Sequence, residues 1–182
     1  MTSFPSHSAI LSATDTGLVR ETNEDYLGIA QTPNEIVCVL LIRENCVWIA
    51  HIGDSRIYLF EARKKRLHRL TSDHSLVQAL INQGIITEKE RIAHPKKNQV
   101  LKALGIKENI GADISEKPIV PSKNDIFLLC TDGLCNEVPD KTIKKILAKN
   151  ATLQEKSDLL MQAAKMAGGQ DNITFELVKI GE

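Results

Sequence analysis

Short apolar runs separated by small polar turns make up most of the first third of the chain. Runs of this length with turn residues between them predict consecutive antiparallel β-strands. A basic and polar stretch, residues 63–69, follows them and predicts a solvated hairpin tip. The runs span residues 9–13, 36–42, 46–52 and 56–60.

In the middle of the chain, apolar residues take up helical spacing. Residues 72–75 (Ser-Asp-His-Ser) supply cap-type side chains, with Asp73 as the expected helix cap, and the helix after them ends at Gly84. Thr87 and Glu90 stand in the positions of a capping box, which predicts the start of a second short helix. A polar loop with a proline, residues 94–98, should follow.

The last third alternates strands with helices. A strongly apolar strand is expected at 126–130, followed by helices over 141–149 and 151–167 and a final strand over 173–180. Gly168-Gly169 should end the second of these helices. This order predicts a single α+β domain, residues 1–182, in which helices cover antiparallel sheets.

Composition and charge narrow the function classes. The 182 residues include 23 basic and 23 acidic side chains, so zero net charge argues against binding to nucleic acid or an anionic membrane. No apolar run approaches the length of a membrane span, and residues 1–13 lack the features of a signal peptide. The spacing of the four cysteines matches no usual zinc pattern, so free thiols in a reducing, cytoplasmic setting are expected.

Acidic residues recur where apolar runs begin or end. Asp132 follows the strand at 126–130, Asp171 precedes the last strand, and Asp54 lies between two early strands. Carboxylates at strand ends can converge on a hard cation such as magnesium or manganese without being buried unpaired. Each Asp-Gly or Gly-Asp pair alone predicts a turn more often than a ligand, so the set of carboxylates carries the argument.

Taken in order, these segments resemble the PPM-type (type 2C) metal-dependent serine/threonine protein phosphatases. The resemblance covers nearly the whole chain in six motifs. They are SATDTGLVRETNEDYLGIA (12–30), VWIAHIGDSRIYLF (47–60), LTSDHSLVQALINQGIIT (70–87), HPKKNQVLKALG (94–105), DIFLLCTDGLCNEVPD (125–140) and GGQDNITFELVKI (168–180).

The resemblance implies a four-layer α-β-β-α sandwich of two antiparallel sheets flanked by helix pairs. Members of this family use two manganese or magnesium ions to activate a water, which attacks the phosphorus of phosphoserine or phosphothreonine. A metal-bound nucleophile and electrostatic stabilisation of the phosphoryl group are what such a site supplies.

The resemblance also assigns roles to individual residues. Asp132 and Asp171 fall at direct metal ligands, and Glu24 and Asp25 at acidic residues that hold metal-bound waters. Arg20 falls at the residue that grips the substrate phosphate, a role suited to a guanidinium fork.

Some of these positions keep an alternative. Asp54 matches an aspartate associated with a third, weaker metal, although a turn-forming role explains its position nearly as well. An ordinary surface salt bridge is the alternative for Arg20. Asp73 and His74 match the family as well, but we interpret them as a helix cap and its neighbour rather than as catalysts.

One family motif is missing. No Asp-Gly-x-Gly-Gly sequence follows the first motif, and no aspartate occurs between Asp25 and Asp54. In the family, that aspartate bridges the two metals, and a pair of long helices follows it. We therefore expect that one strand and a helix pair are deleted, that metal binding is impaired and that one sheet is left uncovered. Glu35, at the junction, is an alternative ligand.

The sequence leaves three functional hypotheses open. The first is a phosphatase for phosphorylated proteins with weak or absent activity, and the second is a non-catalytic pseudophosphatase that binds a protein partner in signalling. The third is an internally deleted form with no independent function. An uncovered apolar sheet also predicts homo-oligomers.

Overall fold

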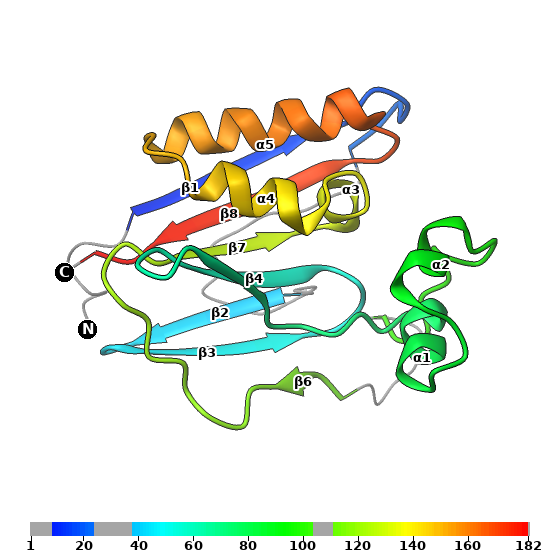
Figure 1. Cartoon of the computed structure of the whole chain (residues 1–182), viewed down its shortest axis with the longest axis horizontal. Coiled ribbons are helices and arrows are strands. Elements are labelled where there is room, and N and C mark those ends of the chain that lie inside the picture. Colours follow the sequence, from blue (N-terminus) through cyan, green and yellow to red (C-terminus); the bar gives the residue numbers. More distant parts are fainter. Residues whose placement is uncertain (1–8, 24–37, 104–110, 182) are drawn as a thin grey trace.

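The computed structural model describes residues 9–23, 38–103 and 111–181. Five of its strands form one antiparallel sheet in the order β1-β8-β7-β4-β5 (Figure 1). Neighbouring strands pair along almost their whole length, with Asp15 opposite Ile173 and Cys130 opposite Phe175. The strands are β1 (Ala9–Asp15), β4 (Arg56–Glu61), β5 (Arg66–Arg69), β7 (Ile126–Cys130) and β8 (Ile173–Lys179).

A smaller sheet packs against one face of the first. It contains β2 (Cys38–Arg43), β3 (Cys46–His51) and the two-residue β6 (Asp113–Ile114), in the order β2-β3-β6. The two sheets bury an apolar core between them, which places the small sheet over the central strands of the large one. Its buried members are Val47, Ile49, Ile57, Leu59, Phe127 and Val178.

Helices cover the opposite face of the five-stranded sheet (Figure 1). They are α3 (Asp132–Cys135), α4 (Asp140–Leu147) and α5 (Leu153–Ala167). Leu128 of β7, Leu134, Ile143, Leu160 and Phe175 are all at most 1% exposed in the core below them. Because β4 and β7 are covered on both faces, they read as continuous apolar runs and not as alternating ones.

Local capping explains where several helices begin. Helix α1 (Leu76–Asn82) starts at Ser75, whose hydroxyl accepts from the Gln78 amide. Helix α2 (Glu88–Ala93) carries the expected capping box, in which Thr87 and Glu90 satisfy each other's backbone amides. A second capping box, Thr152 with Glu155, starts α5. These caps satisfy orphan amides without help from distant residues, so the boundaries follow from local sequence.

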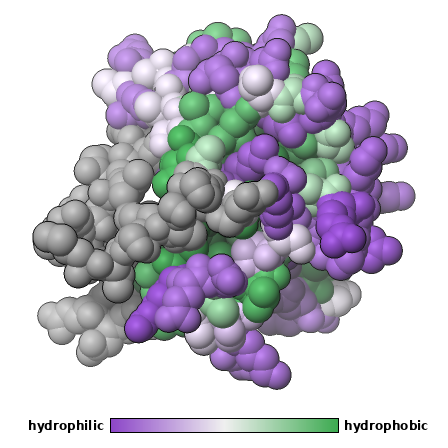
Figure 2. All heavy atoms as spheres, turned by 90° about the vertical axis from the view of Figure 1, so that its left-hand side faces the viewer, coloured by the Kyte–Doolittle hydropathy of each residue, from purple (hydrophilic) through white to green (hydrophobic). Residues whose placement is uncertain are grey.

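The structure confirms an α+β sandwich, with three layers among the described residues: helices, large sheet, small sheet. No described helix lies on the outer face of the small sheet (Figure 1). Val39 and Leu41 of β2 are 39% and 56% exposed there, and Ile114 of β6 is 67% exposed. Figure 2 looks at the end of the sandwich where β2 turns into β3, and apolar surface lies there beside hydrophilic side chains.

Two details differ from the sequence prediction. Residues 66–69 form strand β5, which pairs with β4, so only the residues before them make the hairpin turn. The short helix α3 and the short strand β6 were not predicted, because neither has enough residues to show a period.

All four cysteines are free, with Cys130 and Cys135 buried. Within the described segments, no helix is long and apolar enough to cross a membrane.

Candidate active site

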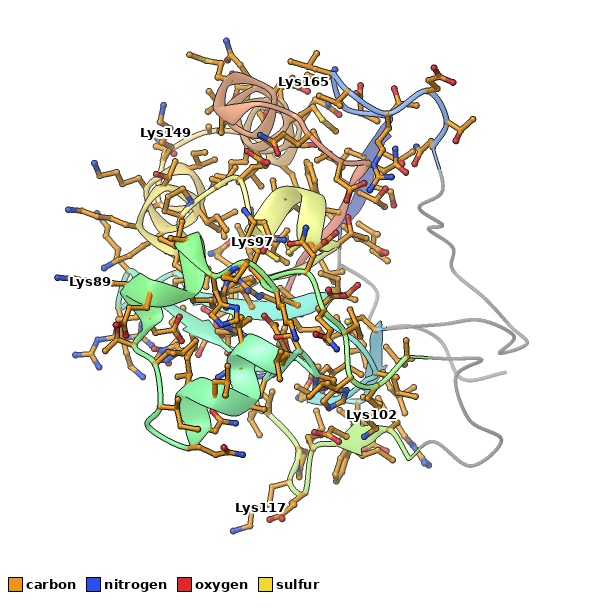
Figure 3. The ribbon with its side chains drawn as sticks, turned by 90° about the vertical axis from the view of Figure 1, so that its right-hand side faces the viewer. Lys89, Lys97, Lys102, Lys117, Lys149 and Lys165 are labelled. Atoms are coloured by element: carbon orange, nitrogen blue, oxygen red, sulfur yellow. The ribbon has the colours of Figure 1, made fainter. Side chains whose placement is uncertain are left out.

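The carboxylates expected at strand ends meet at one end of the five-stranded sheet. Because neighbouring strands run antiparallel, the end of β7 lies beside the beginnings of β4 and β8. Asp132 lies two residues after β7, and Asp171 and Asp54 lie two residues before β8 and β4. Figure 3 faces this end of the molecule, with Lys97 near the middle of the view and Lys165 near its upper edge.

Two glycines let the loops at this end touch. A Cβ on Gly133 would overlap the carbonyl oxygen of Asn172, and one on Gly17 would overlap that of Asp171. Gly17 also has a φ of +78°, which L side chains rarely adopt. Glycine is therefore required at both positions to bring the Asp132 loop and the loop after β1 against Asp171.

Arg20 and Asp171 form a two-point ion pair. The Arg20 Nη2 donates to Asp171 Oδ2 at 3.0 Å, and Nε lies 2.8 Å from Oδ1. The Arg20 side chain is 49% exposed and that of Asp171 36%, so the pair contributes at most about 1 kcal/mol to stability. The surface salt bridge considered for Arg20 thus exists. Its partner is Asp171, the expected metal ligand, so both interpretations of Arg20 put its guanidinium beside Asp171.

Asn172 holds the loop that carries Arg20. Its side-chain amide donates to the carbonyl oxygens of Thr16 (3.0 Å) and Thr22 (2.8 Å), which lie on either side of Arg20. Its backbone amide donates to Asp171 Oδ1 at 2.9 Å. Asn172 is 3% exposed, so burial fixes these bonds. It is a positioning residue for both Arg20 and Asp171.

Asp132 begins helix α3, and its carboxylate accepts from the Asn136 side-chain amide at 3.4 Å. Thr131, just before it, is bound to β8 through the backbone, since its amide donates to the Thr174 carbonyl oxygen at 2.9 Å. The end of β7 is thus fixed to β8 directly beside the carboxylate.

Asp54 lies near the same site in a less solvated position. Burial raises the pKa of its carboxyl group, and repulsion from the Asp73 and Asp171 carboxylates acts in the same direction. Asp54 also lies in the bend between β3 and β4, where Gly53 has a φ of +99°. Asp54 also precedes β4 at the end of the sheet where Asp132 and Asp171 lie, so both interpretations of Asp54 stay open.

Glu24 and Asp25, expected to hold metal-bound waters, lie outside the described residues, and so does Glu35. The structure therefore brings together Arg20, Asp132 and Asp171, with Asp54 close by, and describes nothing for the other three positions.

The prediction that Asp73 caps a helix is wrong. Ser75 caps α1, and Asp73 is a buried acceptor for three arginines, with Arg56 Nη2 at 2.6 Å, Arg69 Nη2 at 2.5 Å and Arg91 Nη1 at 3.4 Å. The Asp73 side chain is 5% exposed and that of Arg56 4%. The arginines come from β4, β5 and α2, so only the tertiary fold brings them to one carboxylate.

A second cluster was not anticipated from the sequence. Among the described residues, only His51, His74 and Asp113 form a group of three potential metal ligands, with ligand atoms within 4.8 Å of one another. The two imidazole rings stack with centroids 4.7 Å apart, and His74 Nε2 lies 3.1 Å from Asp113 Oδ2. Alternation along β3, which points His51 inward beside Val47 and Ile49, was the available sequence signal.

The hydrogen bonds of this cluster favour a proton over a cation. The Gly53 amide donates to His74 Nδ1 at 3.1 Å, so the ring proton of neutral His74 sits on Nε2 and faces Asp113. His51 Nε2 lies 3.0 Å from the Ser72 carbonyl oxygen. A neutral imidazole ring carries one N–H. With a cation on Nε2, that proton would have to move to Nδ1, where it would face the N–H of Gly53, a second donor.

Comparisons with known proteins show what the chain is similar to as a whole. No family model matches the sequence. The serine/threonine phosphatase Stp of Listeria monocytogenes is 39% identical over 162 residues, which are 89% of this chain and 61% of that protein. Protein phosphatase PhpP of Streptococcus pneumoniae is 39% identical over 160 residues, 88% of this chain and 62% of that one. The chain thus spans about three fifths of the length of these curated relatives.

Solved structures show the same fold. A serine/threonine phosphatase of S. agalactiae superposes with a TM-score of 0.84 at 24% identity, covering 96% of this chain and 100% of that one. The catalytic domain of PstP, solved in complex with two manganese ions, superposes with a TM-score of 0.81 at 21% identity, covering 96% and 99%. By sequence and by fold, the chain is thus similar to serine/threonine phosphatases of the PPM type.

Proposed function

We propose that this chain is a metal-dependent phosphatase module for phosphoserine and phosphothreonine in proteins, with slow turnover. The observation that carries the proposal is the meeting of Arg20, Asp132 and Asp171 at one end of the five-stranded sheet. A guanidinium fork beside carboxylates is suited to hold a phosphate next to a cation.

The donor set fits a hard divalent cation. Asp132 and Asp171 offer carboxylate oxygens from adjacent loops, and Asp54, two residues before β4, lies at the same end of the sheet. Oxygen donors of this kind accept manganese and magnesium alike. When bound, such an ion activates a water toward phosphorus and stabilises charge on the phosphoryl group.

The pairing of Arg20 with Asp171 gives Arg20 a second role. Both Asp171 oxygens face the guanidinium, so a cation and Arg20 compete for the same carboxylate. Occupation of Asp171 by a cation would release the Nε and Nη2 donors of Arg20 for phosphate oxygens. Asn172 would meanwhile hold the Arg20 loop in place through Thr16 and Thr22.

Slow turnover follows from the sequence between Asp25 and Asp54, which contains no aspartate and no Asp-Gly-x-Gly-Gly motif. Two cations a few ångströms apart repel, and a shared carboxylate offsets that repulsion. Without it, we infer that at least one ion binds weakly. The proposed loss of an internal strand and helix pair accounts for the missing motif, and the greater length of the relatives is in keeping with it.

The test is phosphate release from a phosphothreonine peptide by purified protein, with and without manganese. We expect manganese-dependent release that Asp132→Asn abolishes and that Glu116→Gln, an exposed acidic residue in the loop after β6, leaves intact. Manganese-independent release, or release equal in Asp132→Asn, would refute a site built on Asp132. Turnover matching that of a full-length family member would refute the incomplete centre.

A second candidate function is a non-catalytic module that binds a protein partner or a second copy of itself. The exposed apolar side chains on the outer face of β2 and β6, Val39, Leu41 and Ile114, favour this alternative. Sedimentation would separate the outcomes: a Leu41→Ser variant should lose association if this face mediates it. A wild-type monomer at micromolar concentration would leave the face without a role in self-association.

A further inference from the structure

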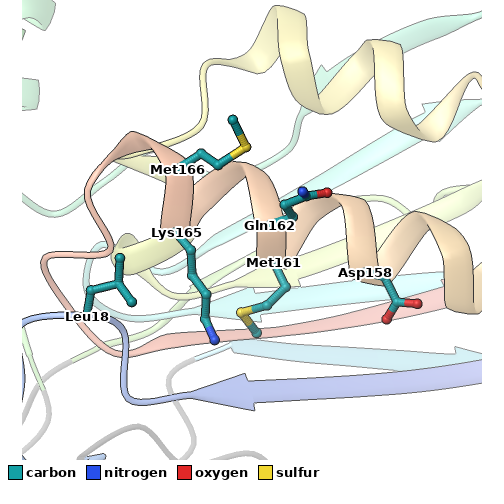
Figure 4. Close-up of a pocket in the computed structure, with 6 residues that line it drawn as sticks. All are labelled: Leu18, Asp158, Met161, Gln162, Lys165 and Met166. Carbon is teal, nitrogen blue, oxygen red and sulfur yellow. The ribbon is translucent and has the colours of Figure 1, made fainter.

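An open groove lies between helix α5 and the loop that carries Arg20 (Figure 4). It has a volume of about 500 Å³, and most of the surface that lines it is apolar. Leu18 lies beside the last turns of α5, and Met161 and Lys165 point toward β1. The lining residues are Leu18, Asp158, Met161, Gln162, Lys165 and Met166.

The apolar groups around this groove are unusually open to solvent. Leu18 is 64% exposed and Met166 80%, and Val19, next to Leu18 in the chain, is 65% exposed. Single exposed apolar residues are ordinary on a protein surface, but a contiguous group of them beside a functional site marks a binding surface. Methionine is flexible and polarisable, which suits contact with side chains of varied shape.

The charged side chains of the groove already have partners. Lys165 Nζ donates to Asp15 Oδ2 at 2.6 Å, and this bond is the main reason that the pKa of Asp15 is lowered. The carboxylate of Asp158 accepts from the Gln154 side-chain amide at 2.8 Å. An incoming group would therefore meet leucine and thioether surface, and apolar contact would dominate its binding.

The groove is fixed in position relative to Arg20. The Leu18 amide donates to the Gly169 carbonyl oxygen at 2.7 Å, and Asn172 holds the same loop at Thr16 and Thr22. Leu18 lies two residues before Arg20, so their Cα atoms are at most about 7 Å apart. That distance is the span of about two residues of an extended peptide.

We propose that this groove binds an apolar side chain of the phosphoprotein substrate, a few residues from the phosphoresidue held at Arg20. The inference rests on the proposed function, because Arg20 supplies the fixed point. The groove is continuous with the loop that carries Arg20, so a peptide whose phosphoresidue is held at Arg20 would reach the groove with a neighbouring side chain. A second copy of the chain would instead need a broad contact surface, about 800 Å² on each partner, whereas only six residues line the groove.

The test compares two phosphothreonine peptides that differ only in carrying leucine or serine two residues from the phosphothreonine, on either side in turn. We expect kcat/KM to be about tenfold higher for the leucine peptide on one of the two sides, since burial of a leucine side chain has an effect of that order. In Leu18→Ser and in Met166→Ser the ratio should fall toward one. Ile85→Ser, an exposed apolar residue after α1, is the matched control and should keep the ratio.

Fluorescence anisotropy of labelled peptides provides a readout that does not need turnover, and the leucine peptide should bind wild type more tightly by a similar factor. Equal kcat/KM and equal binding for both peptides, or a preference that survives Leu18→Ser and Met166→Ser, would overturn the inference. Failure of the proposed function looks different: neither peptide nor p-nitrophenyl phosphate would be hydrolysed, while the binding preference would persist. If Leu18→Ser and Met166→Ser kept the peptide preference but changed the sedimentation of the protein, a second copy of the chain would be the occupant of the groove.

Discussion

Strands β7 and β2 have similar sequences, IFLLC and CVLLIR, and different surroundings. In β7 every residue but Leu129 is buried, because α-helices cover one face and the small sheet the other. In β2 burial alternates, and Val39 and Leu41 reach solvent from an apolar strand. The candidate site lies at one end of the sheet that contains β7, and the missing motif would precede β2 of the small sheet. The proposed site thus lies on the sheet that is the better covered of the two.

The largest expected effect concerns the two kinds of ion pair. Asp73→Asn should lower the free energy of unfolding by about 3–5 kcal/mol, because it leaves Arg56 and its neighbours buried without their counter-charge. Arg20→Ala, which removes the exposed pair with Asp171, should cost less than about 1 kcal/mol. Urea denaturation of both variants measures the difference, and similar losses would mean that the site pair is a structural element of the fold.

A slightly smaller effect should separate the two sheets themselves. Leu128→Ala in β7 should cost about 2–5 kcal/mol, since it opens a cavity in a core from which water is excluded. Leu41→Ala on the outer face of β2 should change stability by less than about 0.5 kcal/mol. If Leu41→Ala were as costly as Leu128→Ala, the outer face of β2 would have to be covered in solution.

The smallest effect is a pH dependence at the end of the covered sheet. The pKa of Asp54 is raised in the folded protein, chiefly by burial, so its ionisation costs stability as pH rises above the ordinary value near 3.8. Asp54→Asn should therefore be more stable than wild type at neutral pH, and the difference should vanish below that value.

Asp15 provides the opposite sign. Its pKa is lowered, mainly by the hydrogen bond from Lys165, so its contribution is present above the ordinary pKa and is lost as pH falls. Asp15→Asn should be less stable than wild type at neutral pH, with the two converging in acid. Thermal unfolding across pH 3–7 checks both variants, and the same sign for both would contradict the assigned causes.

Much of this fold was predictable because the signals are local. Thr87 and Glu90 form their capping box within one helical turn, and the apolar run at 126–130 becomes β7 with the same bounds. The places of Asp132 and Asp171 at strand ends, together with the family motifs, predicted that the two residues would meet, and both lie at the same end of the sheet.

Other features depend on residues far apart in the chain. In the sequence, Asp73 has the position of a helix cap. Its role as the acceptor for Arg56, Arg69 and Arg91 depends on the packing of three separate elements. His51, His74 and Asp113 meet only because β6 pairs with β3, and a two-residue strand leaves no period in the sequence. The role of Asn172 in holding the Arg20 loop likewise required the structure.

The most direct test of this account is a manganese titration of the purified chain followed by electron paramagnetic resonance. If Asp132 and Asp171 hold a cation for which Arg20 competes, Asp132→Asn should weaken manganese binding at least about tenfold, as loss of a ligand does, and Arg20→Ala should strengthen it. Manganese affinity unchanged in Asp132→Asn, or weakened in Arg20→Ala, would contradict a metal site at this end of the sheet.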